Sequence, residues 1–166
     1  MNDVTIIRFN DRPTSTADHE WYGVDGEDGS MLFARTSDAG DPGGAGHLVN
    51  TWTGTRVLAA GSERRGAAAY HLRFPVPDDF IDEFDAWYRH EHAPLLFEEP
   101  TWYACELFRA TRPSLHSFTV IHYLEPEARQ SDIPKKSMLT PWWNRLALND
   151  WWDSEFERVM LTPLGN

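Results

Sequence analysis

The 166-residue sequence predicts an α+β domain in which two helices cover one face of a sheet. Two observations carry this prediction. Short runs rich in β-branched and aromatic residues, typical of strands, recur along the chain. From residue 68 onward these runs alternate with two segments that begin with helix-starting residues. The resulting order, β-α-β-β-α-β, is the split βαβ or ferredoxin-like arrangement.

The first part of the chain shows fewer clear elements, and glycine and proline interrupt them. The predicted elements are a strand at 4–9, a short helical turn around 19–22, a strand at 31–36, a loop at 38–46, a long strand or a hairpin turning near Gly54 at 47–59, and a linker at 61–67. These elements supply strands but no long helix.

The second part is patterned more strongly. A first helix should begin at Pro77–Asp79, because proline suits a first turn and aspartate can cap free N–H groups. It should end at about His92, before Pro94. Thr140 and Pro141 open a second helix that runs to about residue 148. The predicted strands are 68–75, 102–109, 117–124 and 155–161.

Three short segments recur in the same order in the two parts. They are IRF at 7–9 with LRF at 72–74, WY at 21–22 with 87–88, and LFART at 32–36 with LFRAT at 107–111. These matches favour an old duplication, with chance similarity as the alternative. We therefore expect a degenerate first repeat, 1–67, packed on a fuller repeat, 68–166, in one compact domain.

Composition narrows the possible partners. A formal net charge of −11 without a basic stripe disfavours nucleic acid. No stretch approaches the ~20 apolar residues of a membrane span, and the N-terminus does not look like a signal peptide, so we expect a cytoplasmic protein. Cys105 is the single cysteine, which leaves no intrachain disulfide. Eight Trp, nine Phe and five Tyr suit the wall of a ligand pocket, although they can also fill a core.

The second part resembles the dimeric α/β-barrel superfamily, and within it the EthD-like proteins. The helix pattern F-x-x-W-Y-x-x-E-H-x-P and a later T-P-W carry the resemblance, which covers about residues 68–163. The matching residues are Phe84, Trp87, Tyr88, Glu91, His92, Pro94, Thr140, Pro141 and Trp142. The resemblance implies a ferredoxin-like α/β barrel. It does not specify an activity, because relatives include cyclases, isomerases, monooxygenases and haem enzymes.

The first helix places two polar groups beside its apolar face. At 100° per residue, Glu91 falls within the arc of Phe84, Trp87 and Tyr88, and His92 falls at its edge. A buried carboxylate and imidazole can move a proton near neutral pH, so we expect His92 and Glu91 to be catalytic. The alternative is a pair that only hydrogen-bonds the end of the helix. Trp87 and Tyr88 are expected to line the ligand pocket.

Further candidates lie on the strands and the second helix. His122 is a polar residue in the apolar row Phe118, Val120 and Leu124, and with Tyr103 it is a second catalytic candidate. The expected substrate-binding residues are Tyr70, Arg73, Trp102 and Trp142 together with Trp87 and Tyr88. Arg8 and Arg73 occupy matching positions, and either could pair with a substrate carboxylate.

Metal and cofactor signals are weak. His90 and His92 diverge by about 160° on a helix and cannot chelate one ion. No phosphate-binding loop, dinucleotide fingerprint or haem motif occurs, so we expect no metal and no cofactor, with haem as a minor option. Cys105, in mid-strand, is expected to be an inert apolar residue.

The sequence leaves three functions open. The first is a cofactor-independent lyase, decarboxylase, isomerase or cyclase acting on a small aromatic or polyketide-like acid by proton transfer, as in aromatic catabolism. The second is a cofactor-free or haem-dependent oxygenase. The third is a small-ligand-binding or accessory protein without chemistry. An open apolar sheet face predicts a homodimer, and the sequence does not decide whether the barrel closes within one chain.

Overall fold

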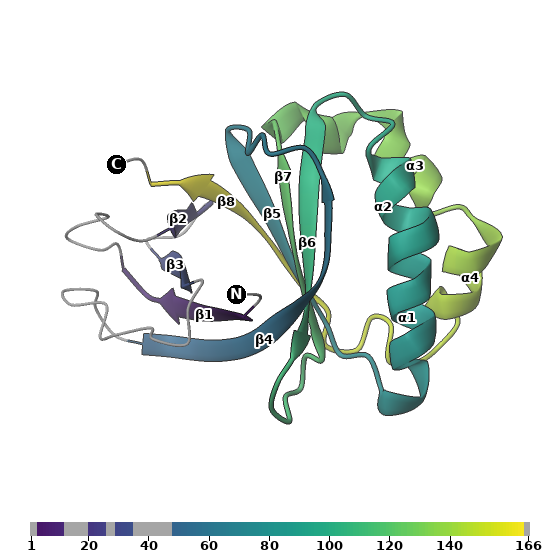
Figure 1. Cartoon of the computed structure of the whole chain (residues 1–166), viewed down its shortest axis with the longest axis horizontal. Helices are drawn as coiled ribbons and strands as arrows, with labels where there is room; N and C mark the ends of the chain where they lie inside the picture. The colour runs from purple at the N-terminus through teal and green to yellow at the C-terminus, as the bar shows by residue number, and fades with distance from the viewer. Residues whose placement is uncertain (1–2, 12–19, 26–28, 35–47, 165–166) are drawn as a thin grey trace.

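In the computed structural model, which describes residues 3–11, 20–25, 29–34 and 48–164, eight strands close into a barrel and the helices pack on one side of it (Figure 1). The strands are β1 (Asp3–Phe9), β2 (Glu20–Val24), β3 (Ser30–Ala34), β4 (Leu48–Gly61), β5 (Ala68–Phe74), β6 (Trp102–Ala110), β7 (Phe118–Leu124) and β8 (Glu157–Pro163). The predicted loop at 38–46 lies outside the described residues.

The order around the barrel is β1-β3-β2-β8-β5-β7-β6-β4, with every neighbouring pair antiparallel for which a register is given. The second half reads β8-β5-β7-β6, which confirms the predicted ferredoxin-like sheet. The first half reads β4-β1-β3-β2. When the four strands of each half are counted in chain order, both halves have the fourth strand beside the first, then the third and the second. The pairs β2–β8 and β4–β6 join the halves, so the barrel closes within one chain.

The shared strand order supports the proposed duplication, but only one of the three sequence matches lies in equivalent strands of the two halves. IRF in β1 and LRF in β5 occupy equivalent strands. The described part of LFART, residues 32–34, lies in β3 and LFRAT begins in β6, which are not equivalent strands, and Trp87–Tyr88 is helical whereas its match is in β2. The division at residue 67 stays a prediction. Because strands of the same chain cover the sheet face, the argument that led to a homodimer no longer applies.

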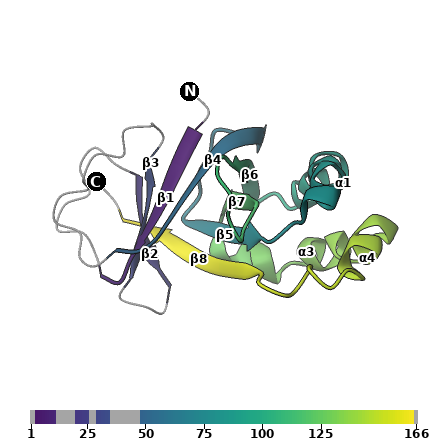
Figure 2. The ribbon, with the colours of Figure 1, turned by 90° about the horizontal axis from the view of Figure 1, so that it is seen from below.

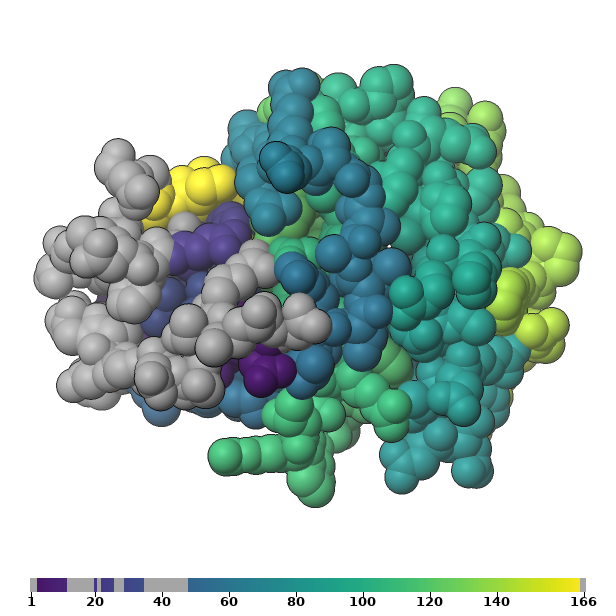
Figure 3. Space-filling model, in the orientation of Figure 1, coloured from purple at the N-terminus to yellow at the C-terminus, as the bar shows by residue number. Residues whose placement is uncertain are grey.

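For the first half, one expectation is corrected and one open alternative is decided. Residues 20–22, predicted as part of a helical turn, belong to β2, because pairing with β3 and β8 outweighs the local pattern. Residues 48–61 form one long strand rather than a hairpin. Gly54 lies within this strand and not in a turn. A Cβ atom at this position would overlap the Trp52 ring and the Arg109 backbone. Figure 3 shows β4 along the junction between the first strands and the helix-covered half.

Within the ranges that the structure describes, all helical segments follow β5. They are η1 (Asp78–Phe80), α1 (Ile81–Trp87), the π turn η2 (Tyr88–His92), α2 (Ala93–Leu96), η3 (Pro126–Gln130), α3 (Asp132–Ser137) and α4 (Pro141–Ala147). The start of α4 is confirmed, since the Thr140 hydroxyl accepts a hydrogen bond from the Trp143 N–H. The segments η3 and α3 were missed, because Pro126 and Pro134 resemble loop residues. None of the helices in the described part of the chain has the length and apolar character of a membrane span.

The prediction that the first helix ends before Pro94 is wrong. It continues through a π turn, in which the Ala93 N–H bonds to the Tyr88 carbonyl five residues back, and α2 carries Pro94 in its first turn. Proline lacks the N–H that a helix interior needs, and the wider turn removes the conflict with the preceding turn. The extended helix keeps Leu96 buried against the sheet.

Strands β5 and β7 are buried along their whole length and β6 along most of it, whereas β8 is largely exposed. Alternate residues pack either against the helices, around Phe84 and Leu107, or inside the barrel, around Phe108 and Ile121. Figure 2 shows the helices and the first four strands on opposite sides of this sheet. The molecule therefore has two cores that share one sheet.

Phe84 tests the helix–sheet core. Its side chain is fully buried and contacts the rings of Phe74 and Phe118 at centroid distances of 4.9 Å. Phe84→Ala is expected to lower the free energy of unfolding by about 3–5 kcal/mol, because a cavity replaces the ring. Urea denaturation measures this. The exposed neighbour His90, changed to Ala, is the control and should shift it by under about 0.5 kcal/mol. A loss below about 1 kcal/mol for Phe84→Ala would contradict this packing.

Candidate functional site

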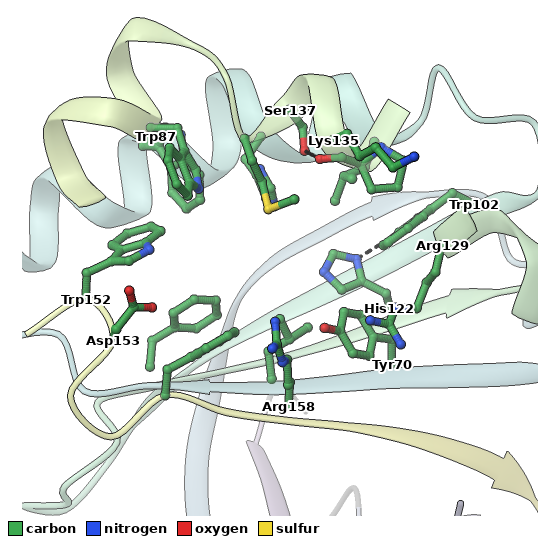
Figure 4. A pocket seen from close by; sticks show the side chains of 18 residues that line it. Tyr70, Trp87, Trp102, His122, Arg129, Lys135, Ser137, Trp152, Asp153 and Arg158 are labelled. Carbon is green, nitrogen blue, oxygen red and sulfur yellow. Dashed lines mark hydrogen bonds between the residues drawn. The ribbon is translucent and has the colours of Figure 1, made fainter. Parts of the chain in front are cut away.

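A cavity of about 290 Å³ lies between the helices and the sheet, and it is called the aromatic cavity below. Strand β5, the helical segments and the chain around β8 line it. The lining residues are Tyr70, Leu72, Phe74, Trp87, His92, Leu96, Trp102, His122, Arg129, Pro134, Lys135, Ser137, Met138, Trp143, Trp152, Asp153, Phe156 and Arg158. Figure 4 shows Tyr70 and His122 on the sheet side, facing Trp87 on the helix side. The volume of the aromatic cavity is close to the lower end of the range for small-molecule pockets, about 300–1,000 Å³.

A buried chain of polar groups holds His122 at the floor of the aromatic cavity. The Trp102 indole N–H donates to His122 Nδ1 at 3.0 Å, as the dashed line in Figure 4 shows. The Tyr88 hydroxyl lies 2.6 Å from His122 Nε2. Since Nδ1 accepts from Trp102, a neutral His122 carries its proton on Nε2 and donates it to the Tyr88 oxygen. Both ring nitrogens are therefore used within the protein.

A β-bulge brings Trp102 to His122. Trp102 pairs with Leu124 and Ala104 with Tyr123, so Trp102 and Tyr103 together oppose one step of β7. Strict alternation along β6 would place Trp102 on the face of Ala104 and Glu106. The extra residue instead turns it to the face of Cys105 and Leu107, in the helix–sheet core.

His92 is presented to the aromatic cavity by the π turn. Its ring stacks on Trp87 with centroids 4.5 Å apart and meets the edge of Tyr88 at 5.1 Å. Burial lowers the pKa of the His92 imidazole to about 3, so the ring is neutral at neutral pH. Among the described residues neither ring nitrogen has a hydrogen-bond partner, and only Nδ1 is shielded from solvent. Nε2 is left to meet a ligand.

Burial also keeps the other polar groups of the floor uncharged. It lowers the pKa of His122 well below its usual value, with a smaller effect from His92, and raises the pKa of the Tyr88 phenol well above 10. Charges lie instead at the exposed rim, where Arg129, Lys135 and Arg158 outnumber Asp153. The cavity thus combines a neutral, hydrogen-bonding floor with a mostly cationic rim.

Six of the ten predicted site residues meet here. Five line the cavity, and Tyr88 lies directly behind His122. The six are Tyr70, Trp87, Tyr88, His92, Trp102 and His122. Their convergence follows from two faces predicted correctly, that of the first helix and that of β7.

Four predicted site residues lie elsewhere. Glu91 accepts a hydrogen bond from the Thr140 hydroxyl and thereby ties the π turn to the start of α4. Tyr103 points away, donates to Glu125 at 3.1 Å and lies under the Arg64 guanidinium. Trp142 packs on the helix–sheet core, and its neighbour Trp143 lines the cavity. Arg73 lies on the opposite face of β5, inside the barrel.

The sequence analysis missed most of the rim. Arg129, Lys135 and Ser137 belong to η3 and α3, which resembled a loop, and Trp152 and Phe156 to the segment before β8. The apolar positions 138, 142, 143 and 152 near two prolines were the available signal, but they follow no helical period. In the part of the chain that the structure describes, no three His, Cys, Asp or Glu residues cluster as metal ligands. Burial raises the pKa of the Cys105 thiol to about 12, which agrees with an inert residue.

Comparison with known proteins shows the fold. No family model and no curated protein matches the chain. The structure of a major regulator of staphylococcal pathogenesis matches with a TM-score of 0.64 at 11 % identity, over 98 % of this chain and 99 % of that chain. An anthrone oxidase-like protein matches with 0.64 at 10 % identity, over 99 % and 92 %. A putative monooxygenase from Fusobacterium nucleatum matches with 0.63 at 10 % identity, over 98 % and 92 %.

A further match, from Listeria monocytogenes, is described as a ferredoxin fold protein related to antibiotic biosynthesis monooxygenases, with a TM-score of 0.60 at 11 % identity over 100 % of this chain and 97 % of that chain. Identities this low show the shared fold alone. The predicted ferredoxin-like α/β barrel is thereby confirmed for this chain.

The buried imidazoles predict that stability depends on pH. His92 and His122 have lower pKa values folded than unfolded, so below pH 6.5 the unfolded chain binds more protons. Above pH 6.5 their neutral forms leave the free energy of unfolding at its full value. This free energy decreases as the pH falls from 6.5 toward the pKa values of the folded state. Urea unfolding between pH 7 and 4.5 measures how the free energy of unfolding changes with pH. This slope should be shallower for His92→Gln than for the wild type, by an amount that corresponds to at most about one bound proton. His90→Gln, an exposed histidine of the same turn, should keep the slope nearer to that of the wild type. Equal slopes for the wild type and His92→Gln would show that His92 is not buried neutral.

Proposed function

We propose that the protein is a cofactor-independent oxygenase of a small, electron-rich aromatic compound that carries an acidic O–H or C–H group. The observation that carries the proposal is His92: a neutral imidazole with an unused Nε2 in an aromatic cavity. The names of structural neighbours support it, since they include an anthrone oxidase-like protein and several putative monooxygenases.

The first function expected from the sequence, a lyase, decarboxylase, isomerase or cyclase, is corrected. The named activities among the structural neighbours are those of monooxygenases, a heme-degrading enzyme from Listeria monocytogenes and a chlorite dismutase from Candidatus Nitrospira defluvii. These names indicate oxygen chemistry. The oxygenase alternative explains them, and proton transfer remains as its first step.

The proposed reaction removes two hydrogens from a doubly activated CH₂ group of the substrate. His92 accepts one proton, and the resulting enolate or phenolate gives electrons to O₂. One oxygen atom forms the new C=O group, and the other leaves as water with both hydrogens: R₂CH₂ + O₂ → R₂C=O + H₂O. The substrate is the reductant and O₂ the oxidant, so the protein supplies positioning and proton transfer.

The cavity favours the charge that this step creates. In a site largely shielded from water, an imidazolium beside the substrate anion is stabilised by its attraction, which offsets the low pKa of free His92. Trp87, stacked on His92, fixes the ring plane. Tyr88 and His122 add hydrogen-bonding groups at the floor, and the cationic rim suits an anionic substrate.

The residues present do not fit a haem. Both nitrogens of His122 are occupied by Tyr88 and Trp102, so this ring has no free nitrogen for an iron. His92 is packed against Trp87 and Tyr88, and a cavity of about 290 Å³ is at the lower limit even for ordinary small ligands. The haem-dependent form of the oxygenase alternative is therefore not proposed.

The narrower likeness to EthD-like proteins also belongs to this proposal. It is supported by the position of the helix motif, because Trp87 and His92 line the cavity and Tyr88 bonds to His122. Two further motif residues, Glu91 and Thr140, bond to each other and hold the π turn in place.

Anthrone tests the proposed reaction, because its CH₂ group lies between two aromatic rings opposite a carbonyl. With wild-type protein we expect oxygen consumption and a stoichiometric quinone product that carries one ¹⁸O atom from ¹⁸O₂. His92→Gln should lower the rate by about 10²–10⁴-fold, the usual contribution of a general base. An oxygen electrode and mass spectrometry measure both quantities.

His90→Gln is the control, since His90 is exposed in the same turn and does not line the cavity. It should keep the wild-type rate. Turnover without oxygen, or an unchanged rate in His92→Gln, would contradict the proposal. So would anthrone that raises the melting temperature but is recovered unchanged, which would favour the ligand-binding alternative.

A further inference from the structure

A second cavity, of about 390 Å³, lies at one end of the barrel on the opposite face of β5; it is called the barrel-end cavity below. Met31, Val49, Asn50 and Val159 line it together with charged and imidazole side chains. Val49, Asn50 and Glu157 are exposed and form its rim, whereas Arg73 and His71 are each 3 % exposed and lie deep inside. Arg158 is the only residue that lines both this cavity and the aromatic cavity among the residues described.

Two arginines face each other across this end of the barrel. In the order β1-β3-β2-β8-β5-β7-β6-β4, β1 and β5 are four strands apart in either direction and so lie opposite one another. Arg8 from β1 and Arg73 from β5, the residues of the recurring RF segments, project into the same lumen and repel each other. Two cations brought together in a site of low dielectric are costly unless an anion accompanies them.

Among the described residues, the charge of Arg73 is compensated only in part. Glu157 approaches Arg73 Nη1 at 3.5 Å, but it is half-exposed and also lies 4.0 Å from His116 Nε2. Nε and Nη2 of Arg73, which form the lateral fork of the guanidinium, have no hydrogen-bond partner in the part of the chain that the structure describes. The same holds for Nε2 of His71 and for the hydroxyl of Thr119, the register partner of Arg73. Arg8 has interactions of its own and contributes positive charge.

We propose that the barrel-end cavity binds the carboxylate of a small organic acid between Arg73, His71 and Arg8. A planar carboxylate with two acceptor oxygens matches the lateral fork of a guanidinium. After a small rotation of Arg73 into the cavity, the anion accepts from Nε and Nη2. His71 donates through Nε2 in the tautomer that carries its proton there. The site is separate from the oxygenase chemistry proposed above.

The balance of charges around the site supports an acid rather than a neutral ligand. Among the described residues that line it, three arginines, Arg8, Arg73 and Arg158, stand against one carboxylate, Glu157, in a chain whose net charge is −11. Burial and the nearby Arg73 and Arg8 lower the pKa of His71 well below its usual value, so His71 adds a hydrogen bond without adding charge.

Titration with acetate and butyrate at constant ionic strength tests this site, with sodium chloride and inorganic phosphate as reference salts. Thermal shift and calorimetry on the full chain should show saturable binding of the carboxylates. Arg73→Gln should weaken it about ten- to a hundredfold, the range of charge-assisted hydrogen bonds. Arg73→Lys, which keeps the charge but not the fork, should weaken it by about tenfold. Arg109→Gln, an exposed arginine outside the cavity, should leave it unchanged.

A shift that follows ionic strength alike in chloride and acetate would overturn the proposal, and saturation by phosphate alone would overturn the carboxylate class. If Arg73→Gln fails to fold, ¹⁵N-histidine NMR of the wild type decides. The Nε2 resonance of His71 should move with acetate concentration along the same saturation curve, and an unmoved resonance would refute the site.

Discussion

The constraint on which the structure depends is that one sheet, β8-β5-β7-β6, is covered on both faces, so that β5, β7 and most of β6 are buried. Its strands must supply apolar side chains to the helices on one side and to the barrel interior on the other. Neighbouring residues of β5 therefore serve different cavities: Tyr70, Leu72 and Phe74 line the aromatic cavity, and His71 and Arg73 the barrel-end cavity. Each buried polar residue on these strands is desolvated and needs a partner, a neutral charge state or a ligand.

The two cavities meet that requirement differently. On the helix side, Trp102, His122 and Tyr88 satisfy one another, and His92 keeps an imidazole nitrogen that no described residue uses. The groups are neutral, which suits a site where charge appears only during a reaction. Inside the barrel, the guanidinium of Arg73 keeps its charge and lacks two partners. A permanent cation of this kind suits recognition of an anion rather than proton transfer.

Two local irregularities position the oxygenase residues that we propose. The β-bulge at Trp102–Tyr103 turns the indole toward His122, and the π turn Tyr88–His92 presents both Tyr88 and His92 while the helix continues past Pro94. Both features insert one residue into a regular element and change the direction in which the neighbouring side chains point. The Thr140–Glu91 hydrogen bond then joins the π turn to α4, so the T-P-W segment acts on the cavity indirectly.

The sequence by itself determined the ferredoxin-like half, the face of β7 that carries His122 and the helix face that carries Trp87, Tyr88 and His92. These follow from periods of two and 3.6 residues, which are local properties of the chain. The tertiary structure alone decided barrel closure within one chain, the strand at 20–24, the turn of Trp102 to the helix side and the separation of Arg73 from the aromatic cavity. Each depends on pairing or burial between residues far apart in the chain, and a strand's alternation does not say which of its faces meets the helices.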